Sequence, residues 1–546
     1  MFVRLASTLN ASLAASPLRH ENFRQFYIAS IGVALGYTMQ ATMAAWLMAT
    51  MTPSALMVAL VQTASTAPTL LFGLMAGALA DIVPRRMVIL LTQIVLLVGS
   101  LILGAATMLG VMSPSLLLVL TFLVGAGFTF YMPAQQASIN DLVGRTDVPQ
   151  AVALGAVAFN VARAIGPAIA GAIAAWVGTG SAMLASAAFF VMMIVVVWGW
   201  RPHEPAIPGV PETLFSGMGS GLRFARHSEL MRSIIIRNLS FSACASALFA
   251  LLPVIARDQL DLGAGGFGVL FGSFGAGAVA GALSIPGLLR TNSLNKVVVG
   301  ATVLWIIATT LVAATNVPIV AIVGATGAGA AWVGVLASLS AGTQSAAPAW
   351  VRARAVAMNL VAVQASLAIG SVVWGAIAQW YDTRVALIAA AVAMLVLLAA
   401  NRRVHVRFGM EADVTPGAQL PDLGIAVEPQ PDDGPVLIQV EYNIEAEHRE
   451  DFLRAIRMVG PTRRRNGATS WRVFRDVGED GRFVERYIIS SWAEYVRLRA
   501  RMTMADRRLQ ELVALYQRVG TPIRVSRLLG VDLPEGAGAP KEDPTH

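Results

Sequence analysis

The stretch AVALGAVAFNVARAIGPAIAGAIAAW at residues 151–176 returns later in the chain as AVAMNLVAVQASLAIGSVVWGAIAQW at residues 355–380. At a constant separation of 204 residues, 13 of the 26 aligned positions are identical. The same separation places residues 73–79 on residues 277–283, with five identities. Because two segments agree on one separation, shared Ala and Gly content alone does not explain the match. The sequence therefore predicts two halves in parallel repeat, an arrangement found in membrane transporters.

The composition around these repeats is typical of a membrane protein. Hydrophobic residues make up 56% of the 546 residues and charged residues only 13%, whereas soluble domains carry about 25% charged residues. Before residue 408, apolar runs recur that are long enough to cross a bilayer as helices of about 20 residues. We therefore predict an all-α polytopic membrane protein with two six-helix repeats. Its twelve transmembrane helices are expected near 24–50, 54–81, 86–110, 115–138, 149–175, 181–200, 229–256, 264–288, 295–315, 317–342, 350–380 and 384–401.

Basic residues near the ends of these predicted helices fall almost entirely on one side. Eighteen Arg and Lys residues lie on that side, and only Arg257 and Arg384 lie on the other. Because Arg and Lys favour the cytoplasmic side, we expect a multi-pass protein of the bacterial inner membrane with both termini cytoplasmic. The first twenty residues hold only a short apolar stretch, so we expect no cleavable signal peptide. We expect a small molecule and membrane lipid as partners, and no nucleic acid.

The short stretch GALADIVPRR ends the second predicted helix. The major facilitator superfamily carries the pattern Gly-x-x-x-Asp-(Arg/Lys)-x-Gly-(Arg/Lys)-(Arg/Lys) at this place, after helix 2 of two six-helix halves. Four residues match the pattern: Gly77, Asp81, Arg85 and Arg86. Ile82 and Pro84 depart from it, and the departure at Ile82 weakens one charge contact, while Asp81 and the final arginine pair remain. At superfamily level, the chain resembles this group of transporters.

Longer stretches, GYTMQATMAAWL, PAQQASINDLV and NVARAIGPAIAG, are similar to the branch of enterobactin-exporter-like transmembrane secretion effectors. The resemblance runs through residues 20–405 and implies transport by alternating access. It also implies that the loop after helix 2 is a gate, which latches the first half against the second when the outer side is open. The alternative is anchoring at the membrane surface, which explains Arg85 and Arg86 but not Asp81, because acids contribute little to orientation.

One charged residue lies in the middle of a predicted helix. Arg163 is about 20 Å along the fifth helix at 1.5 Å per residue, where a charge is costly unless it faces water or a partner. Its counterpart in the second half is Leu367, so the fold does not require a cation there. Since no Asp, Glu or Lys lies near the middle of a predicted helix, we expect an electropositive site for an anionic or oxygen-rich substrate. The alternative is a structural Arg satisfied by helix carbonyls or by Asn160.

Further polar residues in the predicted helices are candidates for substrate binding or coupling. Together with Arg163 they are Asn160, Tyr37, Gln40, Gln62, Tyr131 and Gln364. Polar side chains within membrane helices also hold helices together, so both roles stay open for each residue.

A small-residue motif follows Arg163 in the same helix. Gly166, Pro167 and Gly171 resemble the pattern Gly-x-x-x-Gly-Pro-x-x-Gly-Gly that antiporters of the superfamily carry in helix 5, with Ala162 and Ala170 replacing two glycines. The match favours export over uptake. Close helix packing with a proline kink is the alternative, and both can hold.

The sequence contains no motif for a cofactor. It lacks a Gly-x-x-x-x-Gly-Lys-(Ser/Thr) phosphate loop, which argues against transport driven by ATP. The single cysteine, Cys244, excludes an intrachain disulfide and a multi-cysteine metal site. We therefore expect no catalytic residues, no cofactor and no metal, and a secondary transporter that is coupled to protons.

After a linker the composition becomes soluble, and the order strand, helix, strand, strand, helix, strand predicts a ferredoxin-like α+β domain. This domain resembles the dimeric α+β barrels of antibiotic-biosynthesis-monooxygenase type, which implies a homodimer. We favour a dimerisation or regulatory module over a catalytic one, with Trp471, Trp492 and Tyr495 in the core. The run Arg463–Arg465 is expected in a solvated turn, with contact to anionic lipid as the alternative.

These inferences combine into one predicted organisation. Its segments are a first six-helix half at 1–200, a cytoplasmic loop at 201–228, a second half at 229–405, a linker at 406–434, the ferredoxin-like domain at 435–532 and a disordered tail at 533–546. We predict a secondary active transporter that exports a siderophore-like or other secreted metabolite across the inner membrane. A broad multidrug efflux antiporter is one alternative, and a membrane-anchored sensor or enzyme acting through the C-terminal domain is another.

Overall fold

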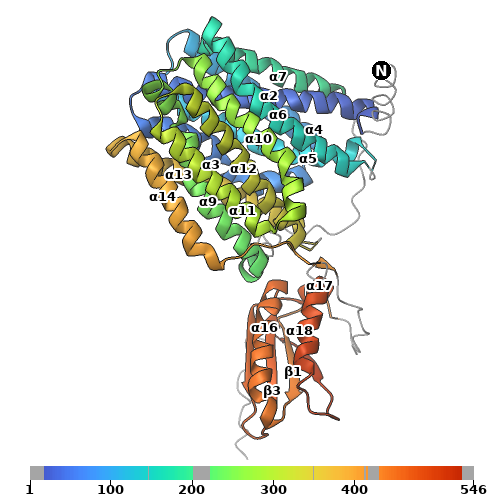
Figure 1. Cartoon of the computed structure of the whole chain (residues 1–546). Coiled ribbons are helices and arrows are strands. Elements are labelled where there is room, and N and C mark those ends of the chain that lie inside the picture. The colour runs from blue at the N-terminus through green and yellow to red at the C-terminus, as the bar shows by residue number, and fades with distance from the viewer. Residues whose placement is uncertain are drawn as a thin grey trace, which may run out of the picture. The chain divides into compact units, whose positions relative to one another are not determined.

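The computed structural model describes residues 17–144, 147–200, 222–348, 350–410, 414–415 and 429–531. Twelve helices in these ranges are long and apolar enough to cross a membrane, which confirms the predicted polytopic fold (Figure 1). Their bounds are α2 (Glu21–Met51), α3 (Ala55–Ile82), α4 (Arg85–Met108), α5 (Pro114–Leu142), α6 (Val148–Val177), α7 (Thr179–Gly199), α9 (Glu229–Val254), α10 (Ala264–Thr291), α11 (Leu294–Ala314), α12 (Pro318–Ala346), α13 (Arg352–Trp380) and α14 (Thr383–Ala400). A 3-10 turn, η1 (Pro17–Arg19), precedes α2, and a π-helical turn, η2 (Ile255–Gln259), continues α9.

Serine side chains mark the starts of several membrane helices. Ser54, Ser113 and Ser293 each accept a hydrogen bond from the backbone N–H three residues later, at the starts of α3, α5 and α11. The first N–H groups of a helix have no partner within the helix, and a capping hydroxyl satisfies one of them. These caps thus satisfy backbone donors that the helices themselves leave without partners.

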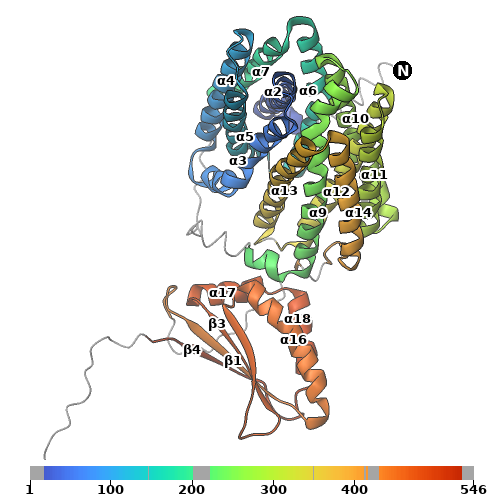
Figure 2. The ribbon, with the colours of Figure 1, turned by 90° about the vertical axis from the view of Figure 1, so that its left-hand side faces the viewer.

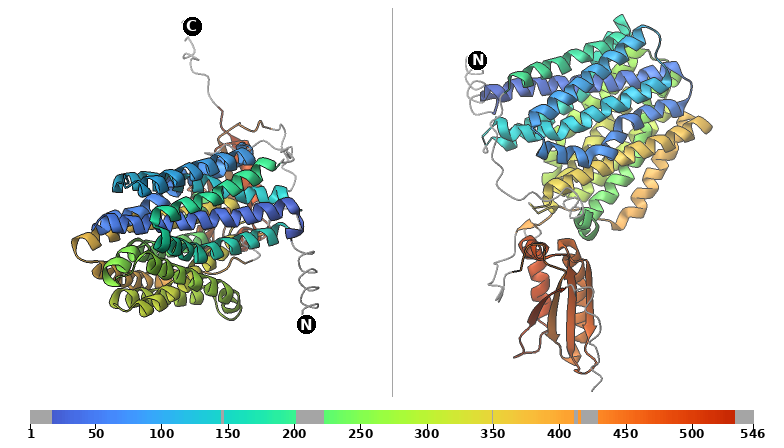
Figure 3. Two further views of the ribbon diagram at one scale, coloured as in Figure 1. Left: turned by 90° about the horizontal axis from the view of Figure 1, so that it is seen from above. Right: turned by 180° about the vertical axis from the view of Figure 1, so that it is seen from behind.

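The membrane helices form two bundles that follow the predicted repeat. Figure 2 shows α2–α7 gathered in one bundle and α9–α14 in the other, and the view from above in Figure 3 shows the blue first half beside the green second half. Tyr37 stacks on Phe128 with ring centroids 3.8 Å apart, and Phe241 packs against Trp332 at 5.8 Å. These pairs lie 204 residues apart in sequence, so the repeat is present in tertiary contacts as well.

Beyond the linker the chain folds into a four-stranded antiparallel sheet in the order β2-β3-β1-β4. Its elements are β1 (Val436–Asn443), α16 (Arg449–Asn466), β2 (Ser470–Arg475), β3 (Arg482–Ile489), α17 (Trp492–Arg501), α18 (Met504–Ala514) and β4 (Arg524–Leu529). In Figure 2 the three helices lie on one side of the strands. The element order is the predicted one, except that the second helix is split in two where Thr503 and Asp506 form a capping box that starts α18. The likeness to monooxygenase-type barrels stays a prediction.

The core of this domain contains a fully buried acid. Glu485 is 0% exposed and accepts hydrogen bonds from Arg463 Nε at 3.0 Å, Trp471 Nε1 at 2.9 Å and Tyr442 Oη at 3.1 Å. Burial raises the pKa of Glu485, but Arg463 and the other donors outweigh burial, so the pKa lies below its usual value. Because a buried charge is tolerated only when it is paired, this network ties α16 to β1, β2 and β3.

The prediction of a solvated turn at Arg463–Arg465 is wrong, because these residues form the last turn of α16. Arg463 pairs with the buried Glu485, and Arg465 pairs with Asp506 at 2.5 Å. Arg464 lies over the Trp471 ring at 5.9 Å. The charges are therefore engaged within the domain and are poor candidates for lipid contact.

The aromatic residues predicted in this core lie there. Trp492 is 8% exposed and Tyr495 is 3% exposed, and Trp471 packs against the same cluster.

Contacts divide the chain into two compact units. The first comprises residues 1–214, 233–343 and 356–407, and the second comprises residues 215–232, 344–355 and 408–546. The predicted loop at 201–228 lies outside the described residues up to residue 221, as does the predicted tail at 533–546. The predicted domain boundaries therefore stay predictions.

Candidate functional site

The helix ends define two ends of the membrane bundle. We call the end that holds the starts of α2, α4, α6, α9, α11 and α13 the arginine-rich end. The end that holds the starts of α3, α5, α7, α10, α12 and α14 is the arginine-poor end.

Helices α6 and α10 run antiparallel and join the two halves along a seam of small residues. Facing pairs along this seam are Gly171 with Gly268, Ala168 with Gly272 and Ala164 with Gly275. A methyl group on Gly268 would lie 2.7 Å from Gly171 Cα, and one on Gly275 would overlap Ala164. Such close approach of two helix backbones requires small residues. The seam therefore depends on Gly and Ala at these positions.

A second contact between the halves joins α3 to α13. Gly375 packs against Ala59, and Thr63 Oγ1 donates a hydrogen bond to the carbonyl of Ala368 at 3.0 Å. At the arginine-poor end, Arg257 Nη1 donates to the carbonyl of Thr52 at 3.0 Å. These contacts close the arginine-poor end between the halves.

The helix-5 motif serves two different contacts. Gly166 faces Thr38 of α2 within the first half, where Thr38 Oγ1 donates to the carbonyl of Ala162 at 3.1 Å. Gly171 faces Gly268 across the seam. The counterparts Gly370 and Gly375 also differ in this way. Gly370 faces Ser246 of α9 within its own half, and Gly375 faces Ala59 of α3 in the other half. The glycines thus serve packing in both halves, whereas Pro167 corresponds to Ser371 in the second half.

Arg163 lies beside Phe159 and Tyr37, which belong to a cluster of aromatic rings from three helices. Its guanidinium carbon is 5.5 Å from the centroid of Phe159, one turn earlier in α6. It also interacts electrostatically with the hydroxyl of Tyr37 in α2. Tyr37 stacks on Phe128 of α5, which lies 6.4 Å from Phe159 between centroids. We call Tyr37, Phe128, Phe159 and Arg163 the Arg163 cluster, and all four are only half-buried.

The side chains at the same four positions of the second half are buried. Phe241, Trp332, Val363 and Leu367 are 3%, 3%, 6% and 4% exposed. The cation of Arg163 and the hydroxyl of Tyr37 correspond here to the apolar Leu367 and Phe241. The half that carries the polar pair is therefore also the half in which these four positions are partly exposed. In the part of the chain that the structure describes, no carboxylate pairs with Arg163. The Arg163 cluster can therefore offer a cation and aromatic faces to a bound molecule.

The other predicted substrate residues are scattered. Gln40 is buried and accepts a hydrogen bond from Ser186 of α7 at 3.0 Å. The Tyr131 hydroxyl approaches Ser30 Oγ at 3.5 Å. Gln62, Asn160 and Gln364 are half-buried. Of the predicted set, the structure thus brings Tyr37 to Arg163.

Sequence reasoning missed Phe128 and Phe159. The position of Phe159 four residues before Arg163 was a usable signal, because residues at that spacing share a helix face. No sequence signal pointed to Phe128, which reaches the cluster only through the packing of α5.

The predicted gate loop makes contacts within the first half. Arg85 Nη1 donates to Asp141 at 2.7 Å, and Arg86 donates to the carbonyls of Val197 and Trp198 at 3.1 and 2.7 Å. A methyl group on Gly77 would meet nothing within 4 Å. The side chain of Asp81 lies outside the described residues. These arginine contacts hold α4 against α5 and α7.

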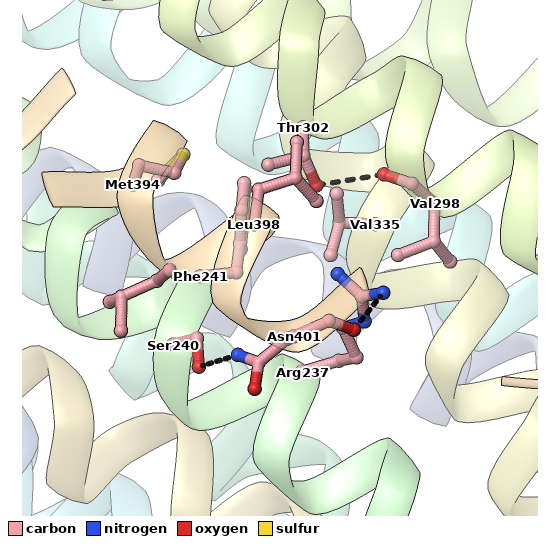
Figure 4. Close-up of a pocket in the computed structure, with 10 residues that line it drawn as sticks. Arg237, Ser240, Phe241, Val298, Thr302, Val335, Met394, Leu398 and Asn401 are labelled. Carbon is pink, nitrogen blue, oxygen red and sulfur yellow. Dashed lines mark hydrogen bonds between the residues drawn. The ribbon is translucent and has the colours of Figure 1, made fainter. Parts of the chain in front are cut away.

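Two cavities lie within single halves. One, of about 20 Å³, is lined by residues that include Arg237, Ser240, Thr302 and Asn401 (Figure 4), and it has room for about one water molecule. The other, of about 190 Å³, lies among α2, α5 and α7 beside Trp200. Among the described residues, no group of three or more His, Cys, Asp or Glu side chains could hold a metal ion.

Comparison with known proteins agrees with this architecture. The family model described as transmembrane secretion effector matches residues 12–534. This chain belongs to that family. The transmembrane secretion effector is thus a multi-pass membrane protein of that family.

Three characterised relatives share part of the effector's length. The staphyloferrin A transporter of Staphylococcus aureus is 26% identical over 45% of this chain and 62% of its own length. The multidrug efflux pump Tap of Mycolicibacterium fortuitum is 26% identical over 49% of this chain and 67% of its own. The enterobactin exporter EntS of Shigella flexneri is 30% identical over 40% of this chain and 54% of its own. The matches to the first and third relatives thus span less than two thirds of those proteins.

Solved structures share the effector's fold. The nucleoside transporter NupG gives a TM-score of 0.56 at 14% identity, over 70% of this chain and 98% of its own. A bacterial homologue of the human lysosomal transporter Spinster, in an inward-facing and unoccupied conformation, gives 0.58 at 14% identity, over 71% and 97%. At such low identity these likenesses show the fold alone.

Proposed function

We propose that this effector is a secondary active exporter, which moves an anionic or oxygen-rich small molecule outward across the bacterial inner membrane by alternating access. The observation that carries the proposal is the Arg163 cluster. A half-buried cation with aromatic neighbours lies in a helix of the seam, and the apolar Leu367 at its counterpart in the repeat supports the view that the fold does not need it. A charge kept in a membrane helix at such cost is expected to serve a ligand.

The orientation of the basic residues supports export from the cytoplasm. Eighteen basic residues against two favour the cytoplasm for the arginine-rich end and for both termini. With this orientation, the contacts between the halves at the arginine-poor end would close the outer side of the transporter. Substrate would enter from the cytoplasm, and parting of the α6–α10 seam would release it outward.

The names of the relatives support a secreted metabolite as substrate. Two are named for staphyloferrin A and enterobactin, and a siderophore-like metabolite with anionic oxygens suits the Arg163 cluster. The relative named as a multidrug efflux pump supports the rival function. A permanently cationic drug would be repelled by Arg163, because no carboxylate near the middle of a membrane helix offsets that charge.

The gate loop would act in the opposite conformer. When the outer side opens, Gly77, Asp81, Arg85 and Arg86 would latch the first half against the second. Arg85 would then exchange Asp141, its present partner, for groups of the second half.

The C-terminal domain would join two copies of the chain. The sheet face that α16–α18 leave uncovered carries Leu528, Leu437 and Ile488 side by side in register. Leu528 is 50% and Ile488 is 36% exposed. An apolar row of this kind fits a homodimer contact.

The test is substrate release by full-length protein in cells and in proteoliposomes, with a catecholate, an organic anion and a lipophilic cation, with and without an uncoupler. We expect uncoupler-sensitive release of the anions only. Arg163→Leu, which copies the second half, should lower anion release at least about tenfold, equivalent to about 1.4 kcal/mol in the barrier. Arg163→Lys keeps the charge and should retain most of it.

Release of the lipophilic cation by the wild type, unaffected by Arg163→Leu, would support the multidrug rival instead. Normal anion release by a well-expressed Arg163→Leu variant would show that the Arg163 cluster does not bind the substrate.

A further inference from the structure

The second compact unit combines the C-terminal domain with two stretches from elsewhere in the chain. These are residues 215–232, which lead into α9, and residues 344–355, which connect α12 to α13. In the described part of these stretches, Arg223 and Phe224 come from the first and Trp350 from the second. Arg223 lies six residues before α9, and Trp350 lies two residues before α13. Contacts to these residues therefore act on the starts of two second-half helices.

Glu494 of α17 is the centre of these contacts. The residue is 7% exposed, and its carboxylate accepts from Arg501 Nη1 at 2.7 Å, Arg497 Nε at 2.8 Å and Arg223 Nη2 at 3.3 Å. Burial raises the pKa of Glu494, but Arg501 and Arg497 outweigh burial, so the pKa lies below its usual value. Glu494 is therefore a charged acceptor for an arginine from outside its own domain.

Trp350 is held between two groups. The guanidinium of Arg501 lies 4.4 Å from the centroid of the Trp350 ring, a cation–π contact. The buried Phe224 meets the same ring edge-on, with centroids 6.1 Å apart. Glu494 and Arg501 thus contact both outside stretches at once.

The fold of the C-terminal domain does not account for these contacts. Arg497 and Arg501 lie on the helix of Glu494 and neutralise it without Arg223. In addition, Nε of Arg223 and Nε1 of Trp350 are buried and find no hydrogen-bond partner among the described residues. A buried donor without a partner is costly, and both donors regain water when the contact opens. This combination is typical of a contact that forms and breaks.

We propose that Glu494 and Arg501 form a docking site for the chain's own Arg223 and Trp350, and that docking restrains the starts of α9 and α13 during transport. The C-terminal domain thereby acts as a brake on the second half. The transport part of this proposal rests on the proposed export function, whereas the docking part does not.

The test uses hydrogen exchange and transport by the full-length protein. Arg223→Gln and Trp350→Leu each remove one contact and leave the C-terminal domain unchanged in sequence. The matched control is Arg226→Gln, an exposed arginine of the same stretch. We expect amides of residues 222–232 and 350–360 to exchange at least about fivefold faster in both test variants, with no change in residues 436–443 or in the control. Transport should become faster in the test variants.

The outcomes separate the two parts of the proposal. Unchanged exchange in Arg223→Gln and Trp350→Leu would overturn the docking site. Faster exchange with unchanged transport would overturn the restraint. If the wild type transported no probe, the export function would fail, and the exchange measurement would still decide whether the site exists.

Discussion

The two six-helix halves of this effector share their packing and differ in their charges. Both place an aromatic pair between their first and fourth helices, and both place one glycine against their own first helix and another in a contact between the halves. Only the first half carries a cation at this level, where Arg163 corresponds to Leu367. The contacts that both halves share are therefore those that the fold requires, whereas a residue present in one half alone, such as Arg163, is not required by the fold.

The carbonyls at the ends of α7 and α14 accept hydrogen bonds from arginines of different helices. In the first half Arg86 of α4 donates to the carbonyls of Val197 and Trp198 at the end of α7. In the second half Arg237 of α9 donates to the carbonyl of Asn401, the counterpart of Val197, at 2.9 Å. The last carbonyls of a helix lack partners within it. Different helices thus supply the cation that both halves require.

The largest effect should come from the seam, which both halves build together. Gly275→Leu should abolish transport, because any side chain at Gly275 overlaps Ala164 and prevents this closed conformer. The matched control is Gly287→Leu in the same helix, where an added methyl group meets nothing within 4 Å. Transport in proteoliposomes at equal protein amounts measures both. Equal activity of the two variants would show that the seam need not close.

A smaller effect should separate the two arginine caps. Arg237 is 5% exposed, and its loss removes the charged donor to the carbonyl of Val404 and one of the two donors to the carbonyl of Asn401, which keeps the backbone N–H of Val404. Arg237→Gln should cost about 2 kcal/mol of stability, and Arg86→Gln, which is half-exposed, about 1 kcal/mol. Thermal unfolding in detergent should rank the variants in that order. The reverse ranking would contradict the idea that burial decides the value of the cap.

The smallest effect should appear at the start of α6. Asp147 accepts hydrogen bonds from Arg19 at 2.8 Å and pairs with His20 at 3.2 Å, whereas its counterpart in the second half is the apolar Val351. The contact with His20, opposed by burial and helped by Arg19, holds the pKa of Asp147 below its usual value of 3.8. A lowered pKa means that the contribution is present above pH 3.8 and lost as the pH falls through the folded value.

Asp147→Asn should therefore speed amide exchange at the start of α2 at neutral pH, and the wild type should match it only at pH values below 3.8. The start of α13, beside Val351, should show no such step. If Asp147→Asn itself showed an equally large change of exchange rate with pH, another titrating group would be its cause.

Much of the fold was predictable because the membrane simplifies the problem. A span must satisfy its own backbone hydrogen bonds, so an apolar run of sufficient length is a helix. In β3, the alternation of strand residues puts Glu485 inward beside Phe483 and Tyr487, and no prediction was made for this residue.

The candidate site was less predictable. Arg163 was found because a charge in a membrane helix is rare, and Tyr37 was one of several polar candidates. Gln40 is a polar residue of the same helix as Tyr37 and was an equal candidate by sequence, yet it faces Ser186 of α7. Which side of a helix meets which neighbour depends on the packing of all twelve helices, and near-uniform apolar sequences carry little information about it.

The sequence by itself determined the twelve spans, the repeat, the lone central cation and the order of elements in the C-terminal domain. These properties follow from local composition and spacing. Only the tertiary structure decided that Phe128 joins the Arg163 cluster, that Gly171 and Gly166 serve different contacts, and that the halves meet at the arginine-poor end. Those properties depend on which helix faces approach one another, and such distances arise from packing between segments far apart in the chain.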